Sequence, residues 1–209
     1  MPYGGNDWLD ITKEDIIEPL LPICDPHHHY WDLRVERTPY AKYLLHELLD
    51  DISGHNITST VFIEARAMYN ADIEKDLKPV GEVEFVEGIS AASASGIYGK
   101  SRASASIIGH ANLNLGNRVE PVLNSLLEAS PRRFKGIRHI VAWDTDKEVD
   151  TVPVYNQEEQ MTTKSFIEGA KVLSKMGLSF DSWMYFHQLP QLLNLAKEVP
   201  DLQIMVDHI

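Results

Sequence analysis

The chain has 209 residues, with 19 Lys and Arg against 31 Asp and Glu, so its formal net charge is −12 at neutral pH. This negative balance argues against nucleic acid and anionic membranes as partners, because both are bound by basic faces. A hydrophobic fraction of 44% supplies ample material for a folded core, and the length favours one large domain.

The first 20 residues form a lead-in, and the folded unit is expected over residues 21–209. The lead-in lacks the basic and apolar regions of a secretory signal, and no run of about 18 apolar residues is long enough to span a bilayer. Cys24 is the only cysteine, which excludes an internal disulfide and fits a reducing compartment. We therefore expect a cytoplasmic protein in which Cys24 is buried by packing.

From residue 21 onward, short apolar segments alternate with segments of helical spacing. The apolar and β-branched segments predict six strands, at 21–25, 58–65, 106–110, 134–141, 178–186 and 202–206. Helical spacing predicts helices at 39–53, 121–128, 163–176 and 189–199. A further helix is predicted to begin at Pro79 and to carry apolar residues as far as Ile89. The serine- and alanine-rich stretch 90–106 reads as a helix end plus a loop, and 144–160 as a polar loop.

This alternation predicts an α/β fold with a parallel sheet. Two architectures fit: an open doubly wound sheet, or a (β/α)8 TIM-type barrel that is incomplete. No glycine-rich nucleotide-binding turn follows any strand, so a nucleotide-binding sheet has no support. A complete barrel takes ~250 residues and rarely fewer than ~200, and six strands already fill this chain, so a barrel here would be partial.

The strongest local signal is the run Asp25-Pro26-His27-His28-His29 at the end of the first strand. Side chains at i, i+2 and i+4 of a strand share a face, so Asp25, His27 and His29 point one way and His28 the other. Two imidazoles on one face, at the carboxyl end of a parallel strand, can chelate one metal ion. The alternative is a surface histidine cluster without a ligand.

Later strand ends add further candidates. His208, next to Asp207, could be a third ligand or a proton carrier, or only a hydrogen-bonded strand-end residue. Arg138 and His139 lie on opposite faces of their strand, and an inward Arg138 would suit a carboxylate or lactone oxygen. Glu64 closes the second strand, where its carboxylate would reach the same mouth, and it is expected to be solvated or ion-paired there. Weaker candidates at strand ends are His110, His187, Trp31, Trp143 and Trp183.

The segment 25–32, DPHHHYWD, resembles the strand-one motif of the amidohydrolase superfamily, in its amidohydrolase-related ("amidohydrolase 2") branch. Six later segments resemble the branch's strand ends in order: VFIEA, GHANL, FKGIRH, LSFDSW, QLP and VDH. The resemblance covers about residues 21–209. Among characterised members of the branch, the chain resembles sugar-lactone hydrolases of the fuconolactone and rhamnonolactone type and 2-pyrone-4,6-dicarboxylate lactonase.

The resemblance implies a (β/α)8 barrel in which an activated water opens a lactone or similar cyclic ester. It makes His27 and His29 metal ligands, His208 a catalytic residue and Arg138 a substrate-binding residue. No metal-bridging carboxylated lysine or glutamate follows the fourth strand, which implies at most one divalent ion, Zn²⁺ or Mn²⁺ by preference. Some lactonases of the branch work without a metal, so an enzyme without one is the alternative.

The resemblance also places the catalytic aspartate at the end of an eighth strand. Because only six strands are predicted, we expect this chain to be C-terminally truncated and to have little or no catalytic activity. The expected substrate is a small molecule, a lactone or a carboxylic acid. Two alternatives stay open: a metal-dependent non-oxidative decarboxylase of the same branch, which would release carbon dioxide, and a non-catalytic fragment.

Overall fold

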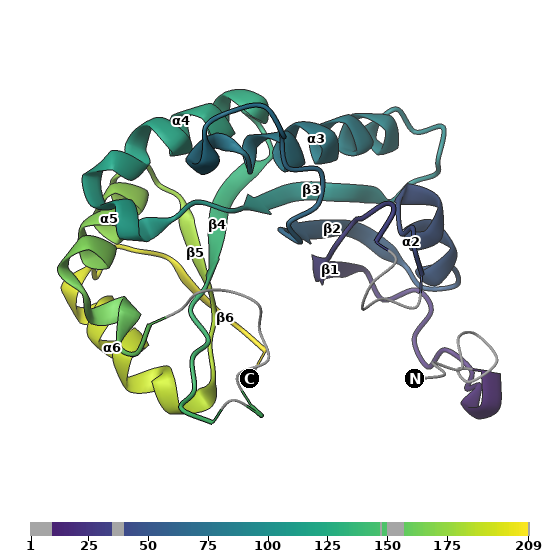
Figure 1. The fold of residues 1–209 in the computed structure, drawn as a ribbon. Helices are drawn as coiled ribbons and strands as arrows, with labels where there is room; N and C mark the ends of the chain where they lie inside the picture. Colours follow the sequence, from purple (N-terminus) through teal and green to yellow (C-terminus); the bar gives the residue numbers. More distant parts are fainter. Residues whose placement is uncertain (1–9, 35–39, 147, 150–156, 209) are drawn as a thin grey trace.

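The computed structural model describes residues 10–34, 40–146, 148–149 and 157–208. Its six strands are all parallel and are hydrogen-bonded strictly in chain order. They are β1 (Ile23–His28), β2 (Ile57–Ile63), β3 (Arg102–Gly109), β4 (Phe134–Ile140), β5 (Ser179–Trp183) and β6 (Ile204–Asp207). A doubly wound sheet reverses its order at a switch point, and this sheet does not. It curls instead into part of a (β/α)8-type barrel, as the sequence predicted (Figure 1).

Helices connect the strands and cover the convex face of the curled sheet (Figure 1). The α-helices are α2 (Leu45–Asp51), α3 (Val80–Ala94), α4 (Glu120–Ala129), α5 (Lys164–Lys175) and α6 (Leu189–Glu198). Short 3-10 turns are η1 (Asp10–Thr12), η2 (Lys75–Leu77), η3 (Leu113–Val119), η4 (Gln160–Thr162) and η5 (Phe186–Gln188). The carboxyl end of every strand therefore meets the same rim, which is where barrel active sites lie.

The core lies between the sheet and these helices, and its aromatic side chains are almost fully buried. Phe134 and Phe180 come from strands, and Phe166 comes from α5, where Thr163 caps the first turn by accepting from the Phe166 amide. Each buried side chain of this size contributes roughly 1.5–3 kcal/mol. The helix α5 also presses closely on η3, because a Cβ at Gly169 would meet the Leu113 carbonyl oxygen at 2.4 Å.

Two sequence predictions about local structure are wrong. Cys24 is exposed rather than buried, because β1 pairs only with β2 among the described strands and so is open along its other flank. The third strand begins at Arg102, four residues before the predicted start. The residues after Arg102 are small, and the Ala103 amide donates to the Ser93 hydroxyl of α3 at 3.0 Å.

The fifth strand is also shorter than predicted and ends at Trp183. The side-chain oxygen of Gln188 accepts from the amides of Tyr185 and Trp143, which turns the chain into η5. The predicted loop 144–160 lies partly outside the described residues.

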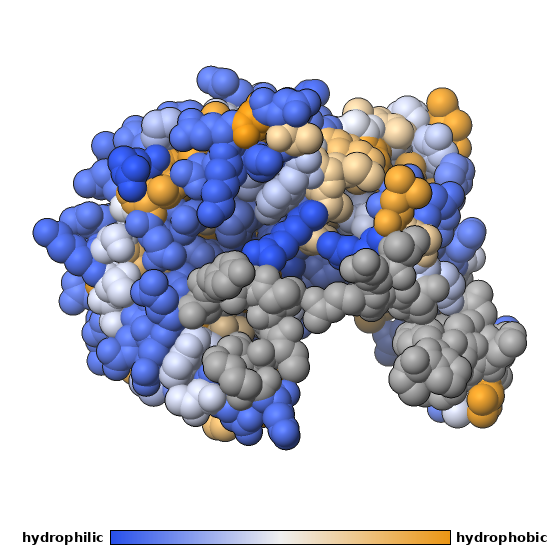
Figure 2. Space-filling model, viewed as in Figure 1, coloured by the Kyte–Doolittle hydropathy of each residue, from blue (hydrophilic) through white to orange (hydrophobic). Residues whose placement is uncertain are grey.

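Hydrophilic side chains predominate on the face shown in Figure 2, in keeping with the chain's acidic composition. Within the described part of the chain, no helix combines the length and apolar character needed to cross a membrane.

Candidate functional site

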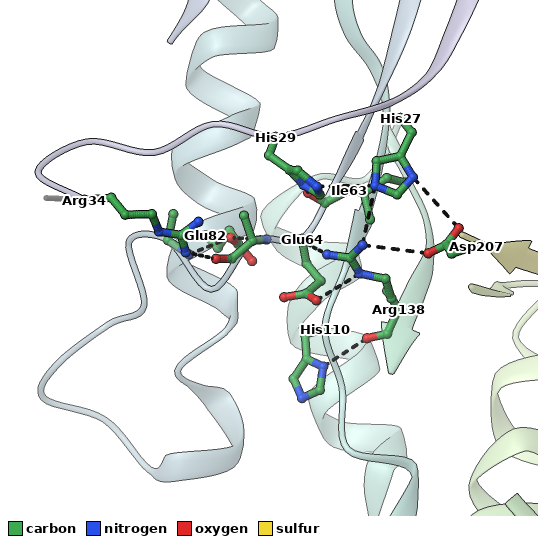
Figure 3. Close-up of polar contacts among 11 residues, drawn as sticks. His27, His29, Arg34, Ile63, Glu64, Glu82, His110, Arg138 and Asp207 are labelled. Atoms are coloured by element: carbon green, nitrogen blue, oxygen red, sulfur yellow. Dashed lines mark hydrogen bonds and ion pairs between the residues drawn. The ribbon is translucent and has the colours of Figure 1, made fainter. Parts of the chain in front are cut away.

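Four polar side chains from three strands meet at the carboxyl-end rim (Figure 3). His27 extends from β1 and His29 from the position directly after it, while Arg138 extends from β4 and Asp207 from β6. The period-two alternation of the strand selects the two histidines, since His28, between them, points the other way. There it is buried, and its Nε2 lies 2.8 Å from the Thr60 hydroxyl. The predicted division of the histidine run is therefore confirmed.

The protonation of His29 follows from its hydrogen bond. Its Nδ1 lies 2.8 Å from the Ile63 carbonyl oxygen, which can only accept, so Nδ1 carries the proton and Nε2 carries a lone pair. Burial is the main cause that lowers the pKa of His29 to about 4. The ring is therefore neutral at pH 7, which is the form that ligates metals.

The same reasoning indicates which ring nitrogen of His27 carries the proton. The guanidinium of Arg138 has only donors, and its Nη1 lies 3.5 Å from Nε2 of His27, so this nitrogen is the acceptor. The other ring nitrogen, Nδ1, faces the Asp207 carboxylate at 3.9 Å. Burial lowers the pKa of His27, partly offset by Asp207. The Nε2 atoms of His27 and His29 lie 3.3 Å apart.

This spacing fits a metal ion. Two nitrogens at ~2.0–2.1 Å from a tetrahedral ion lie roughly 3.3–3.4 Å from each other. Two lone pairs that face each other at this distance repel unless a cation or proton lies between them. His27, Asp207 and His208 also offer ligand atoms that all lie within 4.8 Å of one another. His29 lies outside this group, so the site offers two overlapping donor sets for one divalent ion, the histidine pair and His27 with Asp207 and His208.

Arg138 is the most constrained residue of the site. It is 3% exposed. Its Nε donates to Glu64 at 3.0 Å, a second nitrogen donates to the Glu64 carbonyl oxygen, and Nη1 lies 3.8 Å from Asp207. The guanidinium carbon also lies 5.3 Å from the centre of the Trp183 ring. Glu64 is therefore buried and ion-paired, which is one of the two surroundings expected for it.

His208 lies at the same rim, but its position is less enclosed. Its ring centre is 4.9 Å from that of His27 and 5.2 Å from that of Trp183, and its side chain is exposed. The structure thus brings together all four predicted site residues: His27, His29, Arg138 and His208. Their predicted roles remain proposals.

Other sequence candidates have different surroundings. Asp25 shares the face of His27 but accepts from the His27 amide at 3.1 Å, so it caps its own strand end. His139 faces the helices and contacts Gln160 at 3.2 Å. His187 is exposed and lies 3.1 Å from the Trp143 carbonyl oxygen. Trp31 stacks on Tyr43.

Sequence reasoning gave too little weight to two carboxyl groups on the inner face. The sequence marks Asp207 only as the neighbour of His208 and gives no role to Asp181 on β5. Burial and the nearby Asp207 charge raise the pKa of Asp181 to about 7. The available signal was an acidic residue inside a strand that otherwise reads as buried, since unpaired buried charges are rare.

A pocket of about 480 Å³ adjoins this site and shares Glu64 with it. It lies between the segment that follows β2 and the ends of β3 and β4. His110, at the end of β3, lines it and donates from Nδ1 to the Arg138 carbonyl oxygen at 3.0 Å, so its Nε2 carries the lone pair. Burial lowers the pKa of His110.

Comparisons with known proteins agree on the fold. No protein-family model matches the chain. A curated relative, the uncharacterized protein y4mH of Sinorhizobium fredii, is 26% identical over an alignment 208 positions long, and this alignment covers 90% of this chain and 62% of that protein. The chain therefore spans about three fifths of the length of this relative.

Solved structures of amidohydrolases share the fold at low sequence identity. An amidohydrolase from Burkholderia multivorans with bound zinc matches with a TM-score of 0.62 at 18% identity, over 88% of this chain and 57% of that one. Amidohydrolase 2 from Bifidobacterium longum subsp. infantis matches with a TM-score of 0.56 at 17% identity, over 90% of this chain and 62% of that one. A candidate 2-pyrone-4,6-dicarboxylic acid hydrolase from Pseudomonas putida matches with a TM-score of 0.55 at 12% identity, over 88% of this chain and 56% of that one.

Proposed function

We propose that this chain belongs to the amidohydrolase-related hydrolases and carries the metal-binding half of a site that opens a lactone or similar cyclic ester. One observation carries the proposal: the lone-pair nitrogens of His27 and His29 converge at 3.3 Å beside the buried Arg138, at the carboxyl-end rim. The zinc named for the Burkholderia structure and the pyrone substrate named for the Pseudomonas protein support it.

In this proposal His27 and His29 would hold one divalent ion, Zn²⁺ or Mn²⁺, with His208 beside them, and the chemistry supplied there would be activation of a water at neutral pH. Arg138 is held by Glu64 with Nη1 toward the rim, where a fixed donor can stabilise the charge that develops on a carbonyl oxygen. His208, the most exposed of the three histidines, lies on the solvent side of the site.

The resemblance assigns the general base to an aspartate on an eighth strand. The chain spans about three fifths of the length of its curated relative, so the activity is proposed for the whole protein.

The test is product analysis with a panel of sugar γ-lactones and pyrone carboxylates, in weakly buffered indicator solution with Zn²⁺ or Mn²⁺. Opening of a lactone releases one proton and no gas. Loss of this proton release in a His27→Ala/His29→Ala variant would support the proposal. Carbon dioxide as product would instead identify the decarboxylase of the same branch, and equal rates in native and variant protein would contradict the assigned site.

A further inference from the structure

A buried polar cluster lies on the face of the sheet opposite the histidine pair. His28, the residue between the two histidines, points into it. The other members come from neighbouring parts of the sheet and are likewise buried: Thr60 of β2, Ser104 of β3 and Tyr30, the second residue after β1. Tyr30 also belongs to the hydrophobic core, where its ring stacks on that of Phe62. The cluster therefore joins three adjacent strands behind the candidate site.

The Thr60 hydroxyl is the centre of this cluster. Its oxygen accepts from the Ser104 amide at 2.8 Å and lies 2.8 Å from Nε2 of His28. The amide occupies one lone pair of the hydroxyl, which leaves the hydrogen and a second lone pair for the imidazole, so the contact with His28 forms with either tautomer of the ring. The Ser104 hydroxyl donates to the Tyr30 hydroxyl at 3.3 Å. Connected buried hydrogen bonds of this kind hold side chains in one arrangement.

The backbone around the cluster is irregular on both sides of β2. The β2–β3 pairing shifts register between Ser59 and Val61, the two neighbours of Thr60, and Ser104 opposite them has a left-handed backbone with φ of 51°. The β1–β2 pairing also shifts register just before His28. Irregularities of this kind bend a strand and redirect its side chains, and a left-handed residue other than glycine persists only where its surroundings impose it. The Thr60 hydroxyl contacts both irregular segments.

The strand β2 thus holds the end of β1 from both faces of the sheet. On the rim side, the Ile63 carbonyl oxygen lies 2.8 Å from Nδ1 of His29 (Figure 3). On the opposite side, the Thr60 hydroxyl holds His28. Because consecutive side chains of an extended chain point to opposite faces, an imidazole fixed at His28 also fixes the directions of its two neighbours. The 3.3 Å approach of the Nε2 atoms of His27 and His29 depends on those directions.

We propose that Thr60 is a positioning residue for the histidine pair: its hydroxyl holds His28 on the buried face and thereby sets the approach of His27 and His29 on the other. The inference rests on the proposed function, because the orientation of the pair affects activity only if the pair binds the ion. It adds a residue that touches neither ion nor substrate. Removal of a partner that orients metal ligands typically weakens metal binding about 10–100-fold.

The variants separate the hydroxyl of Thr60 from its size. Thr60→Val keeps the shape and removes the hydroxyl, whereas Thr60→Ser keeps the hydroxyl. His28→Phe keeps a ring behind the pair, removes the side-chain contact with Thr60, and serves as the second test if Thr60→Val fails to fold. The matched control is Thr58→Val, because Thr58 is an exposed threonine of the same strand whose hydroxyl donates to the Ile23 carbonyl oxygen at 3.0 Å.

Two measurements are made on each variant, at a temperature where circular dichroism shows it to be folded. The dissociation constant for Zn²⁺ is measured by competition with a chromophoric chelator. Without metal, two-bond ¹H–¹⁵N NMR of the imidazole rings reports which nitrogen of His29 carries the proton. A loss of stability alone changes neither quantity in the folded chain.

We expect Thr60→Val and His28→Phe to bind Zn²⁺ about tenfold more weakly or worse, and Thr60→Ser and Thr58→Val to bind it as the native chain does. In Thr60→Val the proton of His29 should be shared between both ring nitrogens instead of residing on Nδ1. Native affinity in Thr60→Val and His28→Phe, or an equal loss in Thr58→Val, would overturn the proposal.

The proposed function and the role of Thr60 can fail separately. A native chain that binds no Zn²⁺ would remove the metal site of the proposed function. The proton position of His29 then decides the role of Thr60 alone. A shared proton in Thr60→Val and in His28→Phe, with Nδ1 protonated in Thr58→Val, would support that role, and an unchanged proton position in all variants would overturn it.

Discussion

Nη1 of Arg138 lies 3.5 Å from Nε2 of His27, so a permanent cation stands beside one of the two nitrogens that converge at the rim. A guanidinium cannot accept, and it cannot act as a metal ligand. Nε2 of His27 has one lone pair, so it can accept from Arg138 or ligate an ion, but not both at once. An ion shared with Nε2 of His29, 3.3 Å away, would replace the contact with Arg138 and leave the guanidinium as a fixed charge beside it.

The first prediction concerns that ion. Added Zn²⁺ should raise the melting temperature of the native chain, because a ligand that binds only the folded state stabilises it, by about 2.7 kcal/mol at a hundredfold excess over Kd. The shift should disappear in His27→Ala and in His29→Ala, since each removes one of the two converging nitrogens. Scanning calorimetry with chelator and then with Zn²⁺ measures it.

His55→Ala is the matched control for this measurement, because His55 is exposed and its side chain lies outside the site. A Zn²⁺ shift that survives in both site variants would show that the ion binds elsewhere.

The second prediction concerns the buried ion pair of Arg138 and Glu64, which are 3% and 1% exposed. Removal of one partner leaves the other charge buried and unpaired, which typically costs about 3–5 kcal/mol. Arg138→Gln should therefore lower the free energy of unfolding in urea by about that amount at pH 7. The double variant Arg138→Gln/Glu64→Gln should recover a large part of it. Additive losses in the double variant would argue that the two residues do not act as a pair.

The third prediction is a pH dependence from Glu82. Burial and the neighbouring Glu64 charge raise the pKa of Glu82 to about 8. Between its unfolded pKa of about 4.5 and this value, the folded state holds a proton that the unfolded state has lost, so the stability contributed by this group falls as pH rises through the window. The Glu82→Gln variant cannot ionise and should be more stable than the native chain at pH 8.

Urea unfolding at pH 5 and pH 8 tests whether the free energy of unfolding falls as the pH rises. The variant should lose less stability between the two values than the native chain does. Glu84→Gln, at an exposed position of the same helix, should keep the native dependence. A native chain whose stability rises from pH 5 to pH 8, with Glu82→Gln unchanged, would contradict the assignment.

Local patterns predicted the histidine pair because strand alternation alone separates His27 and His29 from His28. The same reasoning failed for Cys24, since burial of a strand residue depends on whether a neighbour covers that flank, and sequence does not show which strand stands at the edge. The contact between Glu64 and Arg138 joins residues 74 positions apart. Only the order of the strands in the barrel brings them together.

The pocket escaped prediction for a different reason. Arg66 and Lys75 line it from a polar segment between a strand and a helix, where cations are usually solvated. Glu82 accepts from the amides of Ala65 and Ala67, on either side of the left-handed backbone at Arg66, and neither feature has a sequence signature. The order of the β-α units and their helical faces, in contrast, follow from hydrophobic periodicity, and α3, α4, α5 and α6 lie close to their predicted ranges.

The fourth prediction compares glycine-to-alanine substitutions at two helical positions, for which we expect opposite changes in the free energy of unfolding. Gly88 is exposed within α3, and a Cβ there would meet nothing within 4 Å. Alanine at this position should stabilise the chain by roughly 0.5–1 kcal/mol, because it removes the backbone entropy cost of glycine without a new contact.

Gly169 within α5 should respond in the other direction. Its Cβ would meet the Leu113 carbonyl oxygen at 2.4 Å and the Leu113 Cα at 3.0 Å, both backbone atoms that cannot rotate away. The helix must then move from η3, and Gly169→Ala should destabilise the chain by about 1–3 kcal/mol in urea unfolding. Because both changes carry the same helix-propensity gain, their difference isolates the α5–η3 contact. Two equally stabilising variants would mean that α5 does not approach the chain at Leu113 this closely.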